Sequence, residues 1–507
     1  MTNVITYLER DASSFPDKPA FVDEERSVTF LELSRSAMRI ATRILKLTGG
    51  KINVPAAVLL KKGVDCVAAF MGVTYAGGFY TPLDEASPQA RLQKITETLK
   101  PGLIVTDEAH AGLARSLGFP EDRILLLRDC AECEIEEARI REAIAGKIDT
   151  DPLYVLFTSG STGVPKGVTI CHRSVIDYIE WACSAFRFTE DTRFGNQAPF
   201  YFDNSILDLY STLKTGATTY IIPEKLFGFP VKLMEYLNEK QINTIFWVPS
   251  ALIYVANSGI LEKQKPRYLQ KILFCGEIMP NRQLNIWRRA LPSVQYANLY
   301  GPTEITDVCA YFIVDRPMRD YEPLPIGFPC ANTDILVFNE KDEQVQGSET
   351  GELCVRGTSL ALGYYNDPEK TAAAFVQNPL NRRYPERIYR TGDLARYNER
   401  GELIYLGRRD SQIKHMGHRI EIGEIEAAVL SLPGIENGCI VHDDAANSIV
   451  LFYQACAMDA GAVLLGLRKL IPRYMLPNRL VRLDALPFNR NGKIDRSALK
   501  DRLENLE

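Results

Sequence analysis

A short apolar segment followed by a loop of glycines, hydroxyls and a lysine is the feature that most constrains this chain. Residues 154–157 are apolar and are predicted to form a buried strand, and residues 158–167 follow with three glycines, four hydroxyl side chains and Lys166. Glycine allows a close backbone approach, and hydroxyls and a lysine add donors and positive charge, so the loop is predicted to cradle a phosphate. The Walker A spacing is missing. A flexible surface turn would explain neither the lysine nor the strand.

The length and the pattern of apolar segments predict a layered α/β protein with more than one domain. A chain of 507 residues is longer than one hydrophobic core usually supports. Strand-like segments alternate with helix-like segments, which favours mixed, largely parallel sheets packed with helices. The clearest boundary follows residues 401–410. We therefore expect a large N-terminal domain over residues 1–409 and a small, mobile C-terminal α+β domain over residues 410–507.

Composition and charge exclude several classes of protein. The chain is 46% hydrophobic and 24% charged, with a net charge of −5, as expected of a globular protein without a nucleic-acid surface. The N-terminus has no signal-peptide pattern and no uncharged apolar run is long enough to span a membrane, so we expect a cytoplasmic protein with no membrane partner. Of the eleven cysteines, only Cys130 and Cys133 have CxxC spacing, and no second pair completes a zinc site, so free thiols are expected.

The loop resembles the signature loop of the adenylate-forming (AMP-binding) enzymes, which include nonribosomal peptide synthetase adenylation domains, acyl-CoA synthetases and luciferases. The resemblance covers nearly the whole chain and is strongest to stand-alone amino-acid adenylation enzymes, including D-alanine–carrier-protein ligases. It implies ATP and Mg²⁺ as cofactors and a catalytic role for Lys166. The loop residues that it implies bind ATP are Thr158, Ser159, Gly160, Ser161, Thr162 and Gly163.

A second segment, residues 298–304, contains a Gly-Pro turn followed by Thr303 and Glu304. The resemblance implies that Asn298 meets the edge of adenine and Tyr300 its face, that Thr303 contacts the α-phosphate, and that Glu304 holds the metal. Magnesium is usually held by one or two carboxylates together with substrate phosphates, which fits this assignment. The other residues implied to bind ATP here are Gly276, Glu277, Leu299 and Gly301.

A third group of residues is expected to bind the ribose. Asp393 lies beside a glycine turn, and a carboxylate that accepts from ribose hydroxyls is known from dinucleotide sites. The resemblance implies that Asp393 binds the ribose and that Tyr405 and Arg408 support the nucleotide. For Arg408 alone, a surface ion pair is the alternative.

The C-terminal region carries two further positions of the family. Asp410 lies at the expected hinge, before residues 417–426, which closely match a family motif; an ordinary charged linker would explain Asp410 but not that motif. The resemblance implies that the small domain swings between an adenylating and a thiol-transferring pose. It also implies that Lys493 is catalytic and contacts the substrate carboxylate, although Asn489 and Arg490 replace the usual threonine and proline.

Asp203 indicates which acid is activated. It lies among aromatic residues, where a carboxylate needs a partner, and the resemblance implies that it binds the α-ammonium of an amino acid. A helix-capping or hydrogen-bonded structural aspartate is the alternative. The other residues implied to line the substrate pocket are Asn204, Leu207, Trp247, Leu273, Cys275, Leu299, Asp307 and Val308, with Lys493.

Two pocket residues bear on the size and polarity of the substrate. Trp247 is large and would fill much of the pocket, which favours a small substrate. Asp307 departs from the D-alanine-activating enzymes, which have an apolar residue there; it either accepts from a substrate hydroxyl or ammonium, or pairs with another side chain. Alanine of either hand, serine and a short diamino acid all remain open.

These observations predict a ligase that forms a carbon–sulfur bond through an adenylate. It would activate a small amino acid with ATP and transfer it to the phosphopantetheine thiol of a carrier protein. Because only 14 residues follow Lys493, the carrier is expected to be a separate molecule. An acyl-CoA ligase for a non-amino carboxylic acid and a non-catalytic nucleotide-binding protein are the alternatives; Asp203 argues against the first, and the full set of charged residues argues against the second.

Overall fold

The computed structural model describes residues 2–160, 163–409, 412–443, 446–455, 458–487 and 494–504. Its contacts divide the chain into two compact units. The large unit comprises Met1–Leu83, Leu99–Leu156 and Gly167–Arg409, and the small unit comprises Asp84–Thr98, Phe157–Lys166 and Asp410–Glu507. Because the small unit includes two segments from before residue 409, the domain boundary between residues 409 and 410 stays a prediction.

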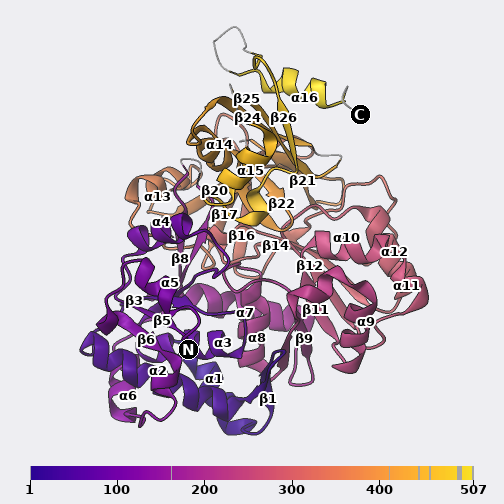
Figure 1. The fold of residues 1–507 in the computed structure, drawn as a ribbon. Helices are drawn as coiled ribbons and strands as arrows, with labels where there is room; N and C mark the ends of the chain where they lie inside the picture. The colour runs from indigo at the N-terminus through magenta and orange to yellow at the C-terminus, as the bar shows by residue number, and fades with distance from the viewer. Residues whose placement is uncertain are drawn as a thin grey trace. The chain divides into compact units, whose positions relative to one another are not determined.

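A nine-stranded sheet forms one layer of the large unit (Figure 1). Its order is β15-β14-β13-β12-β11-β9-β10-β1-β2, and the central strands from β13 to β1 run parallel. The short strands β11 and β12 are apolar and almost wholly buried, as expected of parallel strands covered on both faces. The strands are β1 (Pro19–Val22), β2 (Ser27–Thr29), β9 (Arg193–Asn196), β10 (Thr218–Ile221), β11 (Thr244–Trp247), β12 (Lys271–Phe274), β13 (Gln295–Tyr300), β14 (Ala310–Ile313) and β15 (Phe328–Pro329).

A seven-stranded sheet with the order β18-β8-β7-β4-β3-β5-β6 contains the two strands that border the phosphate loop. β7 ends at Thr158 and β8 begins at Lys166, so the apolar run predicted from the sequence forms a strand. The strands are β3 (Pro55–Leu59), β4 (Phe79–Pro82), β5 (Leu103–Thr106), β6 (Ile124–Leu126), β7 (Pro152–Thr158), β8 (Lys166–Cys171) and β18 (Gly363–Tyr364).

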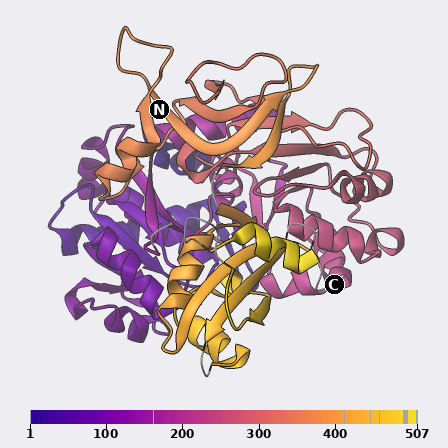
Figure 2. The ribbon, with the colours of Figure 1, turned by 90° about the horizontal axis from the view of Figure 1, so that it is seen from above.

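A third sheet of the large unit is antiparallel and is the curved orange layer in Figure 2. Its strands are β16 (Thr333–Phe338), β17 (Gly351–Gly357), β19 (Phe375–Gln377), β20 (Arg387–Tyr397) and β21 (Leu403–Arg408). The register of the β20–β21 hairpin places Asp393 directly opposite Arg408.

Helices cover the sheets of the large unit. α2 begins with a capping box between Thr29 and Glu32 and ends at the left-handed Gly49, and its apolar face is buried. α7 and α8 lie side by side (Figure 1). The helices are α1 (Ile5–Ser14), α2 (Phe30–Thr48), α3 (Val64–Tyr75), α5 (Ala111–Ser116), α6 (Glu137–Ala145), α7 (His172–Phe186), α8 (Ser205–Thr215), α9 (Pro230–Glu239), α10 (Pro249–Asn257), α11 (Ile260–Lys263), α12 (Asn281–Ala290) and α13 (Pro368–Ala374), with 3-10 turns η1 (Glu121–Arg123), η2 (Leu127–Cys130), η3 (Glu224–Gly228) and η4 (Thr303–Ile305).

The small unit has its own core, in which Ile425, Val429, Leu451 and Met475 are buried together. β24 pairs antiparallel with β25, which pairs parallel with β26, and β22 and β23 form a hairpin. The elements are α4 (Gln89–Leu99, all but its last residue), β22 (Gln412–His415), β23 (His418–Glu421), α14 (Ile422–Leu430), β24 (Ile435–Asp443), β25 (Ser448–Ala455), α15 (Ala460–Leu467), η5 (Arg473–Met475), β26 (Arg479–Arg482) and α16 (Arg496–Glu504).

The predicted fold class, layered α/β with a small α+β part, is confirmed by these sheets. Within the described ranges no helix is long and apolar enough to cross a membrane. The ten cysteines of those ranges are free thiols.

Candidate functional site

Asp203 and Thr303 meet in the large unit. Asp203 lies in the turn between β9 and α8, and Thr303 begins the 3-10 turn η4 after β13. Thr303 Oγ1 donates to Asp203 Oδ2 at 2.6 Å, and the Asn204 N–H donates to Oδ1 at 3.1 Å. Burial raises the pKa of Asp203, the Thr303 hydrogen bond lowers it, and the charge of Glu304 raises it. β9 and β13 belong to the parallel part of one sheet, so the loops after their carboxyl ends lie at the same edge, where α/β proteins bind ligands.

Glu304 is fully buried next to Thr303, and Tyr364 OH donates to its Oε1 at 2.7 Å. A buried carboxylate of this kind fits a magnesium ligand. In the described part of the chain no group of three or more His, Cys, Asp or Glu side chains could hold a metal by itself. Mg²⁺ held by Glu304 would therefore take its other ligands from phosphate oxygens and water.

Asp307 is a second buried acid close to Asp203. Tyr178 OH donates to its Oδ2 at 2.6 Å, whereas its Oδ1 is buried without a hydrogen-bond partner among the described residues. Burial raises the pKa of Asp307 well above its usual range, the neighbouring Asp203 raises it further, and the Tyr178 hydrogen bond lowers it. Pairing with Tyr178 thus accounts for Oδ2 of Asp307 but not for Oδ1.

The apolar residues predicted to line the substrate pocket divide into two groups. Trp247 lies in a different hydrophobic core cluster from the other apolar residues of the predicted pocket. Its Nε1 donates to Gly195 O at 2.8 Å, and its ring packs edge-on against Phe227. The expectation that Trp247 fills the substrate cavity therefore stays a prediction that this packing does not support. The members of the other cluster are Leu207, Leu273, Cys275, Leu299 and Val308.

The residues predicted for the ribose come together on the β20–β21 hairpin and the end of β13. Asp393 is buried; its Oδ1 accepts from Arg408 Nη1 at 2.6 Å, and its Oδ2 accepts from Tyr300 OH. The ring of Tyr405 lies 6.1 Å from that of Tyr300. Arg408 is thus in a buried ion pair rather than the surface pair considered as its alternative. Asn298 is buried on β13, and its Nδ2 donates to Pro325 O at 2.8 Å.

Two glycines in this region meet a conformational requirement. A Cβ on Gly301 would lie 2.2 Å from Asp307 O, so no other residue fits there, and Gly276 has a φ of +100°, which L side chains rarely adopt. The neighbouring Glu277 accepts from the Ser250 N–H at 2.9 Å.

The phosphate loop belongs to the small unit, where several of its polar groups have partners. Ser159 Oγ donates to Arg419 O at 2.7 Å and accepts from the Glu421 N–H at 3.1 Å. The Gly160 N–H donates to Glu424 Oε2 at 3.2 Å, and the other oxygen of that carboxylate pairs with Arg91.

The described residues of the loop show two glycine requirements, while phosphate binding by the loop stays a prediction. A Cβ on Gly160 would lie 2.0 Å from Val164 O, and Gly163 has a φ of +76°. Thr158 Oγ1 is buried without a partner, and Lys166 begins β8 half-buried. Four predicted residues lie outside the described ranges: Ser161, Thr162, Asp410 and Lys493.

The sequence analysis missed several polar residues of the site. In the large unit, Tyr178 on α7 and Tyr364 on β18 donate to the predicted site residues Asp307 and Glu304; in the small unit, Arg91 on α4 pairs with Glu424, which accepts from the loop residue Gly160. None belongs to a motif with a recognisable spacing, and tyrosines on apolar helix or strand faces are usual core residues. Only the tertiary contacts identify them.

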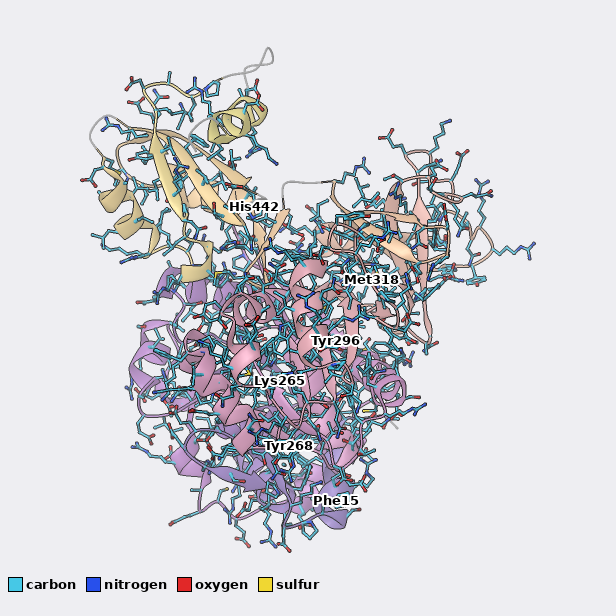
Figure 3. The ribbon with its side chains drawn as sticks, turned by 90° about the vertical axis from the view of Figure 1, so that its right-hand side faces the viewer. Phe15, Lys265, Tyr268, Tyr296, Met318 and His442 are labelled. Atoms are coloured by element: carbon cyan, nitrogen blue, oxygen red, sulfur yellow. The ribbon has the colours of Figure 1, made fainter. Side chains whose placement is uncertain are left out.

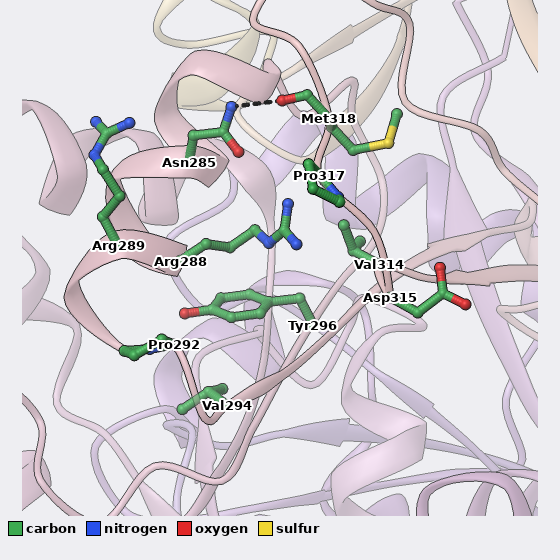
Figure 4. A pocket seen from close by; sticks show the side chains of 10 residues that line it. All are labelled: Asn285, Arg288, Arg289, Pro292, Val294, Tyr296, Val314, Asp315, Pro317 and Met318. Carbon is green, nitrogen blue, oxygen red and sulfur yellow. Dashed lines mark hydrogen bonds between the residues drawn. The ribbon is translucent and has the colours of Figure 1, made fainter.

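A surface pocket of about 420 Å³ lies at the other end of β13 (Figure 4). Tyr296 and Met318, both labelled in Figure 3, line it with Arg288 and Arg289, and Asn285 Nδ2 donates to Met318 O at 2.9 Å. None of the predicted site residues lines it. It faces the amino end of β13, whereas the candidate site follows its carboxyl end.

Comparison with known proteins identifies the family of this chain. The family model described as "AMP-binding enzyme" matches residues 8–365. An L-proline–[L-prolyl-carrier protein] ligase of Pseudomonas fluorescens is 33% identical over 504 residues, which cover 97% of this chain and 97% of that protein. Tyrocidine synthase 1 of Brevibacillus parabrevis is 32% identical over 97% of this chain, which spans only 44% of that longer protein.

A solved structure extends the comparison to the fold. The Vibrio cholerae adenylation domain AlmE, in complex with glycyl-adenosine-5'-phosphate, superposes with a TM-score of 0.84 at 23% identity, over 100% of this chain and 98% of that one. The family match and the proline–carrier-protein ligase together establish what the fold alone would not: the chain is a member of the AMP-binding, adenylate-forming enzyme family.

Proposed function

We propose that this protein activates a small amino acid as its aminoacyl-AMP and transfers it to the phosphopantetheine thiol of a separate carrier protein. The observation that carries the proposal is the hydrogen bond between Asp203 and Thr303. This bond connects Asp203, a buried carboxylate suited to bind an α-ammonium group, with Thr303, the residue expected to contact the α-phosphate. The similarity to a proline–carrier-protein ligase along its whole length supports a carrier-protein acceptor.

The first half-reaction needs positioning and charge neutralisation rather than a general base. A substrate carboxylate oxygen attacks the α-phosphorus of ATP, the bond to the β-phosphate oxygen breaks, and pyrophosphate leaves. Asp203 would hold the ammonium, Thr303 the α-phosphate and Asp393 the ribose, while Lys166 and Lys493 would offset phosphate charge. Mg²⁺ held by Glu304 would neutralise charge on the phosphates. In the second half-reaction the thiolate sulfur attacks the acyl carbon and AMP leaves.

The test is amino-acid-dependent exchange of labelled pyrophosphate into ATP, followed by loading of the amino acid onto carrier protein. We expect exchange with one class of small amino acid and loading of the pantetheinylated carrier but not of the apo carrier. Asp203→Asn should abolish exchange, because the ammonium loses its ionic partner. Asp11→Asn, at a buried aspartate of α1 paired with Arg10, is the matched control and should retain it.

Two results would contradict the proposal. Exchange that depends on non-amino carboxylic acids, with transfer to free coenzyme A, would indicate an acyl-CoA ligase. Absence of exchange with every acid, and with ATP binding retained, would indicate a non-catalytic nucleotide-binding protein.

A further inference from the structure

One carboxylate at the candidate site keeps an oxygen without a partner. Asp307 Oδ1 is fully buried and accepts no hydrogen bond from any residue that the structure describes, while Oδ2 accepts from Tyr178. We propose that Asp307, oriented by Tyr178, binds a second ammonium group on the substrate, so that the enzyme activates a short diamino acid. This inference rests on the proposed function and names its substrate class.

The backbone and Tyr178 together fix the carboxylate of Asp307. Thr306 and Asp307 both adopt left-handed conformations, with φ of +59° and +73°, and strain of this kind is concentrated at functional sites. The ring of Tyr178 stacks on Trp181 along the buried face of α7, with centroids 6.0 Å apart. The Asp307 side chain is thus held in place, and its free oxygen needs a donor that comes to it.

Two other polar groups of the site are also buried without a partner: the hydroxyl of Tyr154 and Nδ2 of Asn204. Asn204 follows Asp203 directly, and the charges of Asp203 and Asp307 both raise the pKa of Tyr154 beyond the effect of its burial. Each orphaned polar atom costs free energy unless a ligand satisfies it. An apolar amino acid would leave these groups unsatisfied, whereas a polar side chain would not.

The charge balance favours an ammonium over a hydroxyl. The side chains that act on the charge of Asp307 are Asp203, Asp208 and Tyr178, none of them basic, within the part of the chain described here. A hydroxyl could share a hydrogen bond with Oδ1 but would supply no counterion, so Asp307 would keep its proton; an ammonium would stabilise the ionised carboxylate. A substrate with two ammonium groups would neutralise both acids, with the α-ammonium at Asp203 and the second at Asp307.

The deciding experiment compares amino acids of similar size in pyrophosphate exchange with the wild-type protein. The panel contains 2,3-diaminopropionate, 2,4-diaminobutyrate and ornithine, with serine, alanine and 2-aminobutyrate as matched controls. We expect one diamino acid to exceed 2-aminobutyrate in kcat/KM by on the order of 100-fold or more, because a site built for a polar group rejects the analogue without it.

Two variants locate that preference. Asp307→Asn should lower kcat/KM for the diamino acid by on the order of 100-fold and change that for alanine much less, because it removes the counterion of the second ammonium. Tyr178→Phe should have an intermediate effect, since it keeps the charge and loses only the orienting hydrogen bond. Asp11→Asn, the buried aspartate outside the site, should leave the profile unchanged.

The possible outcomes separate this inference from the proposed function. Equal use of 2-aminobutyrate and the diamino acids, or a preference for serine, would overturn the inference and leave amino-acid activation intact. Failure of every amino acid would overturn the proposed function itself. If Asp307→Asn does not fold, the wild-type panel and Tyr178→Phe still test the inference. It is rejected if the wild-type protein shows no preference for a diamino acid, or if Tyr178→Phe leaves that preference unchanged.

Discussion

The buried acids Asp307 and Asp393 of the large unit have similar surroundings but opposite charge balance. Each is almost fully buried, and each accepts a hydrogen bond from a tyrosine, Tyr178 or Tyr300. Asp393 also pairs with Arg408, whereas no basic side chain among the described residues acts on the charge of Asp307. The charge of a buried carboxylate that pairs with a protein cation is neutralised without a ligand. A buried carboxylate without such a cation gains a counterion only when a ligand supplies one.

The two positions are fixed by different local structures. Asp393 lies opposite Arg408 in a regular antiparallel hairpin, so the register alone brings the charges together. Asp307 follows the 3-10 turn η4 on a left-handed backbone, where no cross-strand neighbour is available. The hairpin supplies a counterion and the turn does not.

The largest effect is expected from removing the acid of the paired site. Asp393→Ala should lower the free energy of unfolding of the large unit by about 3–5 kcal/mol, because the Arg408 side chain, itself 8% exposed, keeps its charge without its buried partner. Guanidinium-induced unfolding of the full chain, followed by tryptophan fluorescence, measures the loss. All three tryptophans belong to the large unit.

Asp393→Asn is the control for shape, since it keeps the size and one acceptor oxygen while it removes the charge and replaces the other acceptor with an amide donor. It should also destabilise the protein, by less than the alanine variant. A loss below 1 kcal/mol in both variants would mean that the Arg408 pair is screened by water, and the contrast with Asp307 would disappear.

A smaller, pH-dependent effect is expected at the unpaired site. Because the pKa of Asp307 is raised in the folded chain, the folded state holds a proton to higher pH than the unfolded state. The free energy of unfolding should therefore fall as pH rises from the ordinary aspartate pKa to the raised one, by at most about 1.4 kcal/mol per pH unit. Asp307→Asn should remove this contribution, which a series of denaturation curves between pH 4 and pH 8 at ~1-unit steps would show.

The variant should be less stable than, or equal to, wild type at low pH and more stable at high pH. Because Asp203 interacts with Asp307, the difference between the two proteins reports the titration of both acids as a coupled pair. A difference that does not change with pH would contradict the assignment of Asp307 as an uncompensated acid.

The smallest effect is expected from the tyrosine hydroxyls. Tyr178→Phe removes one hydrogen bond to Asp307 and should lower the free energy of unfolding by about 1 kcal/mol, the typical contribution of one hydrogen bond. Combining it with Asp307→Asn in a double-mutant cycle gives the coupling energy. Tyr300→Phe with Asp393→Asn gives the corresponding value for the paired site, and it should be larger because the acceptor is charged. Equal couplings would contradict the difference in charge.

The sequence predicted the fold class and the strand that precedes the glycine-rich loop, because both depend on local patterns; phosphate binding by the loop stays a prediction. The apolar run before Thr158 forms β7, and alternating strand-like and helix-like segments form the parallel sheets. Resemblance to a family also selected Asp203, Thr303 and Glu304, which the structure brings together although Asp203 lies far from the other two in the chain.

What the sequence could not predict depends on tertiary contacts. Tyr178 reaches Asp307 from α7, and a tyrosine on a buried helix face has the same pattern whether or not its hydroxyl contacts an acid. Side-chain direction alternates along β11, so Trp247 lies in a different core cluster from Leu273 on the neighbouring strand, and its expected place in the substrate pocket stays a prediction. Both cases need the packing of elements that are distant in sequence.

The left-handed backbone at Asp307 limits how the specificity of this enzyme can be engineered. A library at position 307 that includes valine or isoleucine would lose stability for reasons unrelated to the substrate, by about 1–2 kcal/mol. Asparagine, glycine and aspartate tolerate this conformation. Redesign toward apolar amino acids should therefore begin with glycine or asparagine at 307 and add hydrophobic volume at Val308 or Leu299, which carry no such restriction.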